Sequence, residues 1–263
     1  MTKEPAGQPP GATAEGSGVF LSVVIPAYNE ERRLPASFEQ ILHFLDGQSY
    51  RAEILVVENG STDATWDVAN AAAERDPRIR VLREPIRGKG AAVRRGMLAA
   101  KGAYRFLCDA DLSMPIEEVQ NFLPPALECV DIAIGSREAE GAVRYEEPGI
   151  RHLMGRVFNT LVRIALVPEV QDTQCGFKCF RAEAANEIFR RVTRTGFSFD
   201  VESLVIANRF GYRIEQIPVH WHFDSDSRVR VVQDTLGTVF DVLVIWLKAL
   251  RGVYDPDRSN SPN

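Results

Sequence analysis

Cysteine is scarce in this sequence. Four occur among 263 residues, at Cys108, Cys129, Cys175 and Cys179, and no two of them form a C-x-x-C pair. A chain of this length does not depend on disulfides for its stability, and Cys175 and Cys179 have no nearby His or Cys pair that would complete a zinc site. We therefore expect reduced thiols, no structural zinc and a cytoplasmic location.

Long hydrophobic runs are also lacking. No window has the length and apolarity of a transmembrane helix. The nearest candidate, "VFDVLVIWLKAL" at 239–250, is too short and contains Asp241 and Lys248. Residues 1–18 are rich in Gly, Pro and Ala without an apolar stretch, so we interpret them as a disordered tail rather than a signal peptide.

Neither sign of charge dominates the composition. Charged residues make up 25% of the chain and the formal net charge is -5, which argues against general nucleic-acid binding. The hydrophobic content of 45% is sufficient for one sizeable core. Basic residues still cluster between positions 83 and 95, and a local cluster can bind phosphate whatever the total charge.

Two common phosphate-binding motifs are absent. A dinucleotide-binding fold has G-x-G-x-x-G after its first strand, whereas this chain has "PAYNE" at 26–30. A P-loop ends in G-K-[ST], and Gly88-Lys89-Gly90 lacks the hydroxyl. These absences exclude hydride-transfer and NTP-hydrolysis sites of those kinds.

Strand and helix patterns alternate through the first half of the chain. Apolar, β-branched runs predict strands at 19–26, 52–59, 78–84, 104–109 and 130–137, and helical spacing predicts helices at 31–46, 61–75, 90–101 and 115–128. This alternation predicts an α/β fold with a doubly wound parallel sheet. Ligands bind such sheets beyond the carboxyl ends of the strands, where "PAYNE", "ENGSTD", "DAD" and "GSR" lie.

The alternation weakens after residue 137. We expect a loop at 138–151, helices at 151–166, 181–191 and 200–210, a loop entering a short strand at 172–180, and a strand at 212–221. One domain is expected over 19–230, followed by an amphipathic helix over 231–252 and a tail over 253–263. The helix can lie on a membrane surface, pack on the domain or form a dimer seam.

Two carboxylates, Asp109 and Asp111, follow the fourth strand. Such a pair commonly holds Mg²⁺ or Mn²⁺ while substrate phosphates complete the coordination shell. The alternative is a capping role, in which Asp111 or Ser113 caps a helix that begins at Pro115.

Five motifs occur in one order over roughly 20–235: "VVIPAYNE", "VVENGSTDAT", "RGKGAAVRRG", "DADLSMP" and "DTQCGFKCF". Together they resemble family 2 glycosyltransferases of the GT-A fold, and most of all the polyprenyl- or dolichyl-phosphate hexosyltransferases. "DTQCGFK" and "FSFDVESL" are similar to the dolichyl-phosphate glucosyltransferase branch. The resemblance implies a mostly parallel, doubly wound sheet with helices on both faces.

The resemblance also implies a donor site. The residues that would contact the nucleotide sugar are Pro26, Ala27, Tyr28, Glu30, Glu58, Asn59, Arg87, Lys89, Asp109 and Ala110. The family usually has Asp-Asp where this chain has Glu58-Asn59, which leaves the base contact and the identity of the base open. Packing for Tyr28, a first-turn helix position for Glu30 and a solvated turn for the basic segment remain alternatives.

The acceptor decides which other residues matter. Asp200 is a candidate general base, although it can instead cap the helix that follows it. A lipid phosphate is already anionic at neutral pH and hardly needs a base. It needs cations, and the loops after the donor motifs offer five candidates: Arg137, Arg144, Arg151, Lys178 and Arg228. We choose Arg137 and Arg228 among them and expect Lys178 to contact substrate as well. His220 and His222 are either late metal ligands or polar strand ends.

The expected reaction is inverting transfer of glucose from UDP-glucose to a polyprenyl phosphate, with Asp109 and Asp111 holding Mg²⁺ or Mn²⁺ and with Asp111, Lys89, Asp200 and Arg228 as catalytic residues. The expected partners are the nucleotide sugar, the lipid, a membrane surface and a second copy of the chain, with no nucleic acid. Three alternatives remain open: GDP-mannose as donor, a soluble acceptor, and a non-catalytic sugar-nucleotide-binding protein of the same fold.

Overall fold

A mixed seven-stranded sheet forms the centre of the molecule in the computed structural model, which describes residues 18–146, 159–160, 162–223 and 231–256. The strands lie in the order β3-β2-β1-β4-β7-β5-β8. Their bounds are β1 Leu21–Ala27, β2 Ala52–Glu58, β3 Ile79–Arg83, β4 Tyr104–Leu107, β5 Ile132–Ser136, β7 Lys178–Arg181 and β8 Ile214–Pro218. A separate pair joins β6 Val143–Tyr145 to β9 His220–His222.

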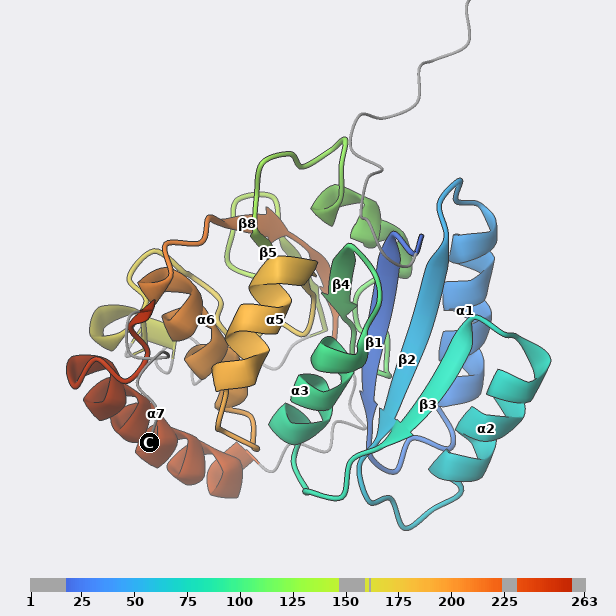
Figure 1. The fold of residues 1–263 in the computed structure, drawn as a ribbon, viewed down its shortest axis with the longest axis horizontal. Coiled ribbons are helices and arrows are strands. Elements are labelled where there is room, and N and C mark those ends of the chain that lie inside the picture. The colour runs from blue at the N-terminus through green and yellow to red at the C-terminus, as the bar shows by residue number, and fades with distance from the viewer. Residues whose placement is uncertain (1–17, 147–158, 161, 224–230, 257–263) are drawn as a thin grey trace, which may run out of the picture.

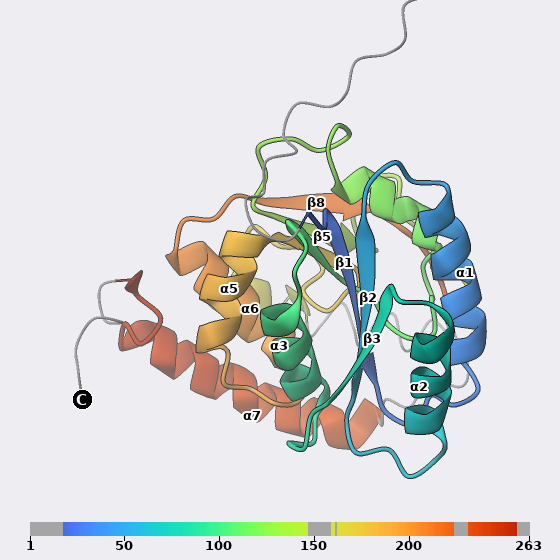
Figure 2. The ribbon, with the colours of Figure 1, turned by 45° about the vertical axis from the view of Figure 1, so that its right-hand side comes forward.

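Helices cover both faces of this sheet (Figure 1). The helices are α1 Leu34–Asp46, α2 Thr65–Arg75, α3 Lys89–Ala99, α5 Ala182–Arg191, α6 Phe199–Arg209 and α7 Val231–Leu250, with the 3₁₀ helix η1 at Ile116–Phe122. One apolar core packs α1 and η1 on one face, and a second core packs α3, α5 and α6 on the other. Figure 2 shows α7 lying outside α6 at the periphery of the second face.

In the first half of the chain the structure confirms the predicted alternation of strands and helices up to β4, because the strand sequences are apolar enough to be buried on both faces. The runs "LSVVIPA" and "AEILVVE" are buried almost throughout, as strands with helices on both faces must be. Pairing of β1 with β2 and β4 is parallel, so the carboxyl ends of these strands meet at one edge. The fold is the predicted α/β arrangement with a mostly parallel sheet.

The structure departs from the sequence expectations in three places after β4. The helix expected at 115–128 is a 3₁₀ segment that ends before Pro124 and Pro125, because proline lacks the N–H that a longer helix would use. The loop expected at 138–151 contains β6, and the strand expected at 212–221 divides into β8 and β9 after Pro218.

Strand β7 runs antiparallel to both of its neighbours, β4 and β5. Its first residue, Lys178, therefore lies at the edge where the parallel strands end. This inserted strand brings a segment more than 60 residues away in sequence beside Asp109.

The four cysteines lie too far from one another to be paired in the structure, and whether the thiols are reduced stays a prediction. All four cysteines are free, and burial raises the pKa of Cys108 and raises that of Cys175 to about 11. Among the described residues, no helix has the length and apolarity needed to cross a bilayer.

Candidate active site

The acid pair lies beside a lysine from the basic segment. Lys89 begins α3, and its Nζ is 2.6 Å from Asp109 Oδ1. Burial alone would lower the pKa of Lys89, but the charges of Asp109, Asp200 and Asp111 outweigh it and raise that pKa. Lys89 is therefore a fixed cation among three carboxylates at neutral pH.

Asp111 lies next to this ion pair, and its carboxylate binds a backbone N–H group. Its Oδ1 accepts the backbone N–H of Ser113 at 3.0 Å. Burial, and then the charge of Asp109, raise the pKa of the Asp111 carboxyl. The two acids therefore repel each other, and a cation between them would relieve that repulsion.

Gly176 closes the site against Asp109. A Cβ placed at Gly176 would lie 2.2 Å from Asp109 Oδ2, so a larger residue at this position would displace the Asp109 carboxylate. Gly176 lies inside the "DTQCGFK" motif, but the motif alone does not reveal which atom requires the missing side chain. The close approach shows that Gly176 leaves room for the Asp109 carboxylate.

Asp200 and Lys178 form a buried ion pair. Lys178 Nζ lies 2.6 Å from Asp200 Oδ1 and donates to the carbonyl oxygen of Cys175 at the same distance. Burial raises the pKa of Asp200 despite the opposing charges of Lys178 and Lys89. Asp200 lies one residue inside α6 and bonds Lys178, so its alternative role as a helix cap is wrong.

The capping alternative for the acid pair fails as well. The cap position of η1 is Pro115, and no side chain makes a capping hydrogen bond there.

Glu30 precedes the turn that leads into α1, and its carboxylate binds Arg33 at 3.1 Å. It is therefore not a first-turn helix acid.

Asn59 is fully engaged with the loop that carries the basic residues. Its Nδ2 donates to the carbonyl oxygens of Glu84 and Ile86 at 2.9 and 2.7 Å, and its Oδ1 accepts the N–H of Gly88 at 2.7 Å. Its backbone N–H donates to Ala27 O. Asn59 therefore holds the loop at 84–88, a positional role that the sequence motif did not reveal.

The nearby Glu58 is also occupied within its own loop. Glu58 Oε1 accepts the N–H of Ser61 at 2.5 Å, and Oε2 lies 3.6 Å from Arg83 Nε. The side chains of Glu58 and Asn59 are both buried. Their predicted contact with the base remains a prediction.

Tyr28 and Arg87 form an exposed pair at the mouth of the first loop. The Arg87 guanidinium lies 4.8 Å from the centre of the Tyr28 ring and donates to its hydroxyl. Tyr28 is 38% exposed and its ring packs on Arg87, so its contact with the nucleoside stays a prediction. Asn29, which the motif pattern did not single out, has φ 55° and accepts the N–H of Thr62 at 2.7 Å, locking the first two loops together.

Three further predicted residues, Pro26, Ala27 and Ala110, have no polar side chain. The observed hydrogen bonds of the two alanines are made by their backbone carbonyl groups. Pro26 is half-buried, Ala27 is buried, and its carbonyl receives Asn59. Ala110 is buried and its carbonyl accepts Ser37 Oγ at 2.6 Å. Their contacts with substrate remain predictions.

Arg137 is held at the end of β5 by a buried acid. Its Nε and one terminal nitrogen bind Asp172 at 2.7 and 2.9 Å. Burial would raise the pKa of Asp172, but the charge and hydrogen bonds of Arg137 lower it to about 2. Arg228, the other predicted cation for the acceptor, lies outside the described residues.

The two histidines near the end of the sheet have other partners. His220 Nδ1 is 2.7 Å from Glu118 Oε1, and the His222 ring stacks on Tyr145 with centroids 4.3 Å apart. In the described parts of the chain, no group of three or more His, Cys, Asp or Glu side chains could hold a metal alone.

The residues present nevertheless fit a divalent cation that is shared with substrate. Two neighbouring carboxylates, of which Asp111 has its pKa raised by burial and then by the charge of Asp109, offer hard oxygen ligands. A set of two is suited to Mg²⁺ or Mn²⁺, which take further ligands from water and phosphate.

The order of the strands and the mostly parallel sheet are those of a glycosyltransferase of the GT-A type. The chain belongs to glycosyl transferase family 2, whose model, "Glycosyl transferase family 2", matches residues 22–189. It is 32% identical over 259 residues to the dolichyl-phosphate beta-glucosyltransferase of Saccharomyces cerevisiae, covering 90% of this chain and 77% of that protein. It is 33% identical to the human dolichyl-phosphate beta-glucosyltransferase, covering 92% and 80%.

Solved structures share the fold at lower identity. The glucosyl-3-phosphoglycerate synthase of Mycobacterium tuberculosis in complex with UDP has a TM-score of 0.62 at 22% identity, covering 94% of this chain and 86% of that chain. The same enzyme in complex with Mn²⁺ and UDP-glucose has a TM-score of 0.60 at 20% identity, covering 86% and 79%. At these identities the likeness establishes the fold alone.

Proposed function

We propose that this enzyme transfers glucose from UDP-glucose to a polyprenyl or dolichyl phosphate, with inversion at the anomeric carbon. The observation that carries the proposal is the identity of 32–34% to enzymes named dolichyl-phosphate beta-glucosyltransferase, which extends over about nine tenths of the chain. The geometry of the site is consistent with it.

The donor site would act by electrostatic stabilisation of the nucleotide diphosphate. Lys89 and the basic loop would bind the diphosphate, and Tyr28 with Arg87 would bind the nucleoside. Asp109 and Asp111 would hold Mg²⁺ or Mn²⁺, which when bound supplies positive charge to the departing diphosphate. Lys89 stays protonated because three carboxylates surround it, so its charge does not depend on pH near neutrality.

Attack by the acceptor phosphate would need no general base. A phosphate monoester is anionic at neutral pH, so no proton has to be removed from the attacking oxygen. Asp200 Oδ1 is occupied by Lys178, which suits a role in fixing that lysine rather than in proton transfer. Arg137, Lys178 and Arg228 remain the cations that we assign to the acceptor side.

A lipid acceptor requires contact with the surface that contains it. The outer face of α7 exposes Phe240, Leu243, Leu247 and Leu250, while Ile245 and Ala249 pack inward. We assign this outer face to peripheral contact with a membrane, because its side chains are apolar and exposed rather than packed in the core.

The test is transfer of labelled glucose. Purified protein with UDP-[¹⁴C]glucose, Mn²⁺ and polyprenyl phosphate should place label in a chloroform–methanol extract, and Asp111→Asn should abolish this transfer while preserving the melting temperature. GDP-[¹⁴C]mannose serves as the parallel donor. Label confined to the aqueous phase with every prenyl phosphate would refute the lipid acceptor, and near-normal activity of Asp111→Asn would refute the metal assignment.

A further inference from the structure

The connection between α5 and α6 lies between the start of α3 and α7 (Figure 2). Residues 193–197 of this connection are called the bridging segment below. The carbonyl oxygen of Thr195 accepts the N–H of Ala91 in the first turn of α3 at 3.2 Å, and the Phe197 ring centre lies 6.0 Å from Lys89 Nζ. The bridging segment therefore borders the residue that the proposed function places against the donor diphosphate.

Very little space separates the bridging segment from the start of α3. A Cβ at Gly88 would lie 2.2 Å from Thr195 O, and a Cβ at Gly90 would lie 2.5 Å from Arg194 O. Close-packed elements transmit a displacement to each other instead of absorbing it. A shift of the bridging segment must therefore move the first turn of α3 as well.

One buried side chain of α6, Glu202, holds the bridging segment. Its Oε2 accepts the N–H groups of Thr193 and Arg194, both at 2.7 Å. Its Oε1 accepts the hydroxyl of Thr193 at 2.7 Å and that of Tyr254 at 2.8 Å. Glu202 is fully buried, so water does not replace these partners. Four donors on two oxygens require a carboxylate, because glutamine would turn its own NH₂ group toward two of them.

The partners of Glu202 on the side of α7 suit a buried anion. Burial, and then the charge of Glu202, raise the pKa of Tyr254, so its hydroxyl keeps its proton and donates. Lys248 Nζ lies 3.9 Å from Glu202 Oε1 and donates to Thr193 Oγ1 at 2.8 Å. The lysine supplies the positive charge that a buried carboxylate needs.

The other tie of the bridging segment is more exposed. Arg194 binds Asp241 of α7 at 2.9 Å, but the two side chains are 23% and 26% exposed. Ion pairs that water can reach contribute little. The buried Glu202 is therefore the main anchor of the bridging segment.

We propose that Glu202 is a positioning residue for the sugar-nucleotide donor: it fixes the bridging segment against the start of α3 and thereby sets the place of Lys89 opposite the diphosphate. The inference rests on the donor site of the proposed function, but not on the identity of the acceptor. Glu202 acts through the backbone of Thr193 and Arg194.

The first test compares two buried carboxylates by titration calorimetry with UDP and Mn²⁺. Glu202→Gln should weaken UDP binding about tenfold, the effect of misplacing one charge-assisted hydrogen bond. Glu53→Gln is the matched control. Glu53 is buried and accepts the N–H of Lys101 and the hydroxyl of Ser22, both at 2.7 Å, but it lies near the start of β2, away from the carboxyl ends of the strands. Both variants should lower the melting temperature, and only Glu202→Gln should lose UDP affinity.

A milder pair of variants keeps the proposal testable if Glu202→Gln does not fold. Thr193 is exposed, and Thr193→Val removes one hydroxyl from Glu202, so UDP binding should weaken about threefold. Thr195→Val is the control, because Thr195 contacts α3 through its carbonyl group, which the substitution retains.

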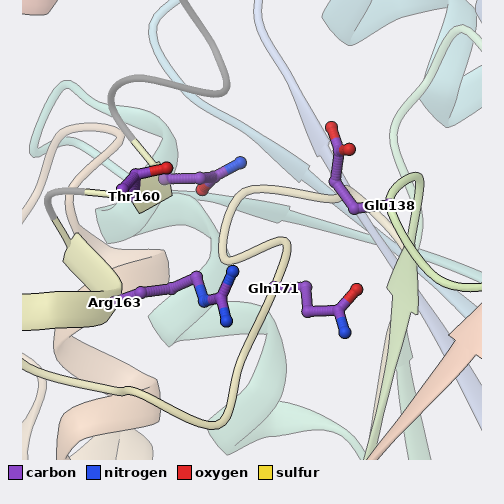
Figure 3. A pocket seen from close by; sticks show the side chains of 5 residues that line it. Glu138, Thr160, Arg163 and Gln171 are labelled. Carbon is purple, nitrogen blue, oxygen red and sulfur yellow. The ribbon is translucent and has the colours of Figure 1, made fainter.

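A control outside the bridging segment uses a polar cavity beside the end of β5. This cavity has a volume of about 250 Å³ and is lined by Gln171 among other residues (Figure 3), none of which belongs to α6 or to the bridging segment. Gln171→Ala changes an exposed side chain there and should keep the wild-type UDP affinity. A loss of UDP affinity in Gln171→Ala or Glu53→Gln as large as that in Glu202→Gln would overturn the proposal.

The second test separates positioning from general stability and from the proposed reaction. In the transfer assay, Glu202→Gln should raise the KM for UDP-glucose and leave the KM for prenyl phosphate unchanged. Deuterium exchange of the Ala91 amide should become faster, because its acceptor Thr195 O is displaced.

The outcomes distinguish this inference from the proposed function. If the wild-type protein binds UDP but transfers no glucose to prenyl phosphate, the proposed reaction fails, and the calorimetric comparison still decides the role of Glu202. If the wild-type protein transfers glucose while folded Glu202→Gln and Thr193→Val keep wild-type UDP affinity, the positioning role is wrong although the reaction stands.

Discussion

Single residues in this site are largely paired before any substrate arrives. Lys89 bonds Asp109, Lys178 bonds Asp200, and Asn59 uses both ends of its amide on one loop. Such pairing fixes side chains in advance, which lowers the entropy lost when a charged substrate binds. Substitutions here should therefore change geometry as well as charge.

Asn59→Asp isolates the positional role of one amide. The carboxylate would lose the two bonds donated to Glu84 O and Ile86 O and would place its charge against those oxygens. We expect the Kd for UDP to rise about tenfold or more, since the loop carrying Arg87 and Lys89 would shift. Titration calorimetry provides the measurement, and Asn70→Asp in α2, whose amide donates to Trp66 O, is the control. Unchanged UDP affinity would contradict this role.

At the scale of elements, the site depends on segments that approach each other closely. The stretch at 194–199 lies against the start of α3, where Thr195 O accepts the N–H of Ala91. Gly88 and Gly90 allow this contact, and Gly88 also has φ 128°. The basic loop is thus held by Asn59 from the sheet side and by this stretch from the helix side.

Gly90→Ala tests the close approach. A Cβ at Gly90 would lie 2.5 Å from Arg194 O and 2.7 Å from Phe199 Cβ, so the loop must move. We expect a lower melting temperature and weaker UDP binding, although alanine favours helix by about 1 kcal/mol over glycine. Gly237→Ala in α7 is the control, because nothing lies within 4 Å of its Cβ position. A raised melting temperature for both variants would show that the contact is not tight.

The Arg137–Asp172 pair joins the end of β5 to the segment before β7, and its contribution should depend on pH. The pKa of Asp172 falls from 3.8 to about 2 on folding, so its stabilisation is complete above pH about 4 and is lost as pH falls toward 2. The shift corresponds to about 2 kcal/mol. Chemical denaturation of wild-type and Asp172→Asn proteins should give a stability difference that shrinks through this window. A difference independent of pH would contradict the ionised pair.

At the scale of the whole molecule, α7 combines an inward face with an outward apolar face. Leu243→Ser together with Leu250→Ser should reduce sedimentation with anionic liposomes and leave the melting temperature near that of the wild type, because both side chains are exposed. Ile245→Ser, which alters a fully buried side chain of the same helix, should lower the melting temperature instead. Unchanged liposome binding with loss of a dimer in sedimentation velocity would assign the face to a second copy of the chain.

The sequence predicted those parts of the molecule that local pattern controls. Strands buried on both faces and the acid pair at the end of β4 follow from runs of apolar residues and from spacing. The antiparallel position of β7 and the partners of Asn59 and Asp200 depend on contacts between segments far apart in sequence. Periodicity carries no information about such contacts, so roles assigned from loop position alone were incomplete.

Hydrogen bonds to Glu202 make local opening of the molecule measurable by hydrogen exchange. Its buried carboxylate accepts the N–H groups of Thr193 and Arg194 at 2.7 Å and the hydroxyl of Tyr254 at 2.8 Å, just beyond α7. The exchange of those two amide hydrogens with deuterium is therefore limited by release of the last helix and of the stretch that supports the basic loop. Their exchange rates therefore measure how often the stretch at 193–194 and the end of α7 separate from Glu202, and the measurement needs no substrate.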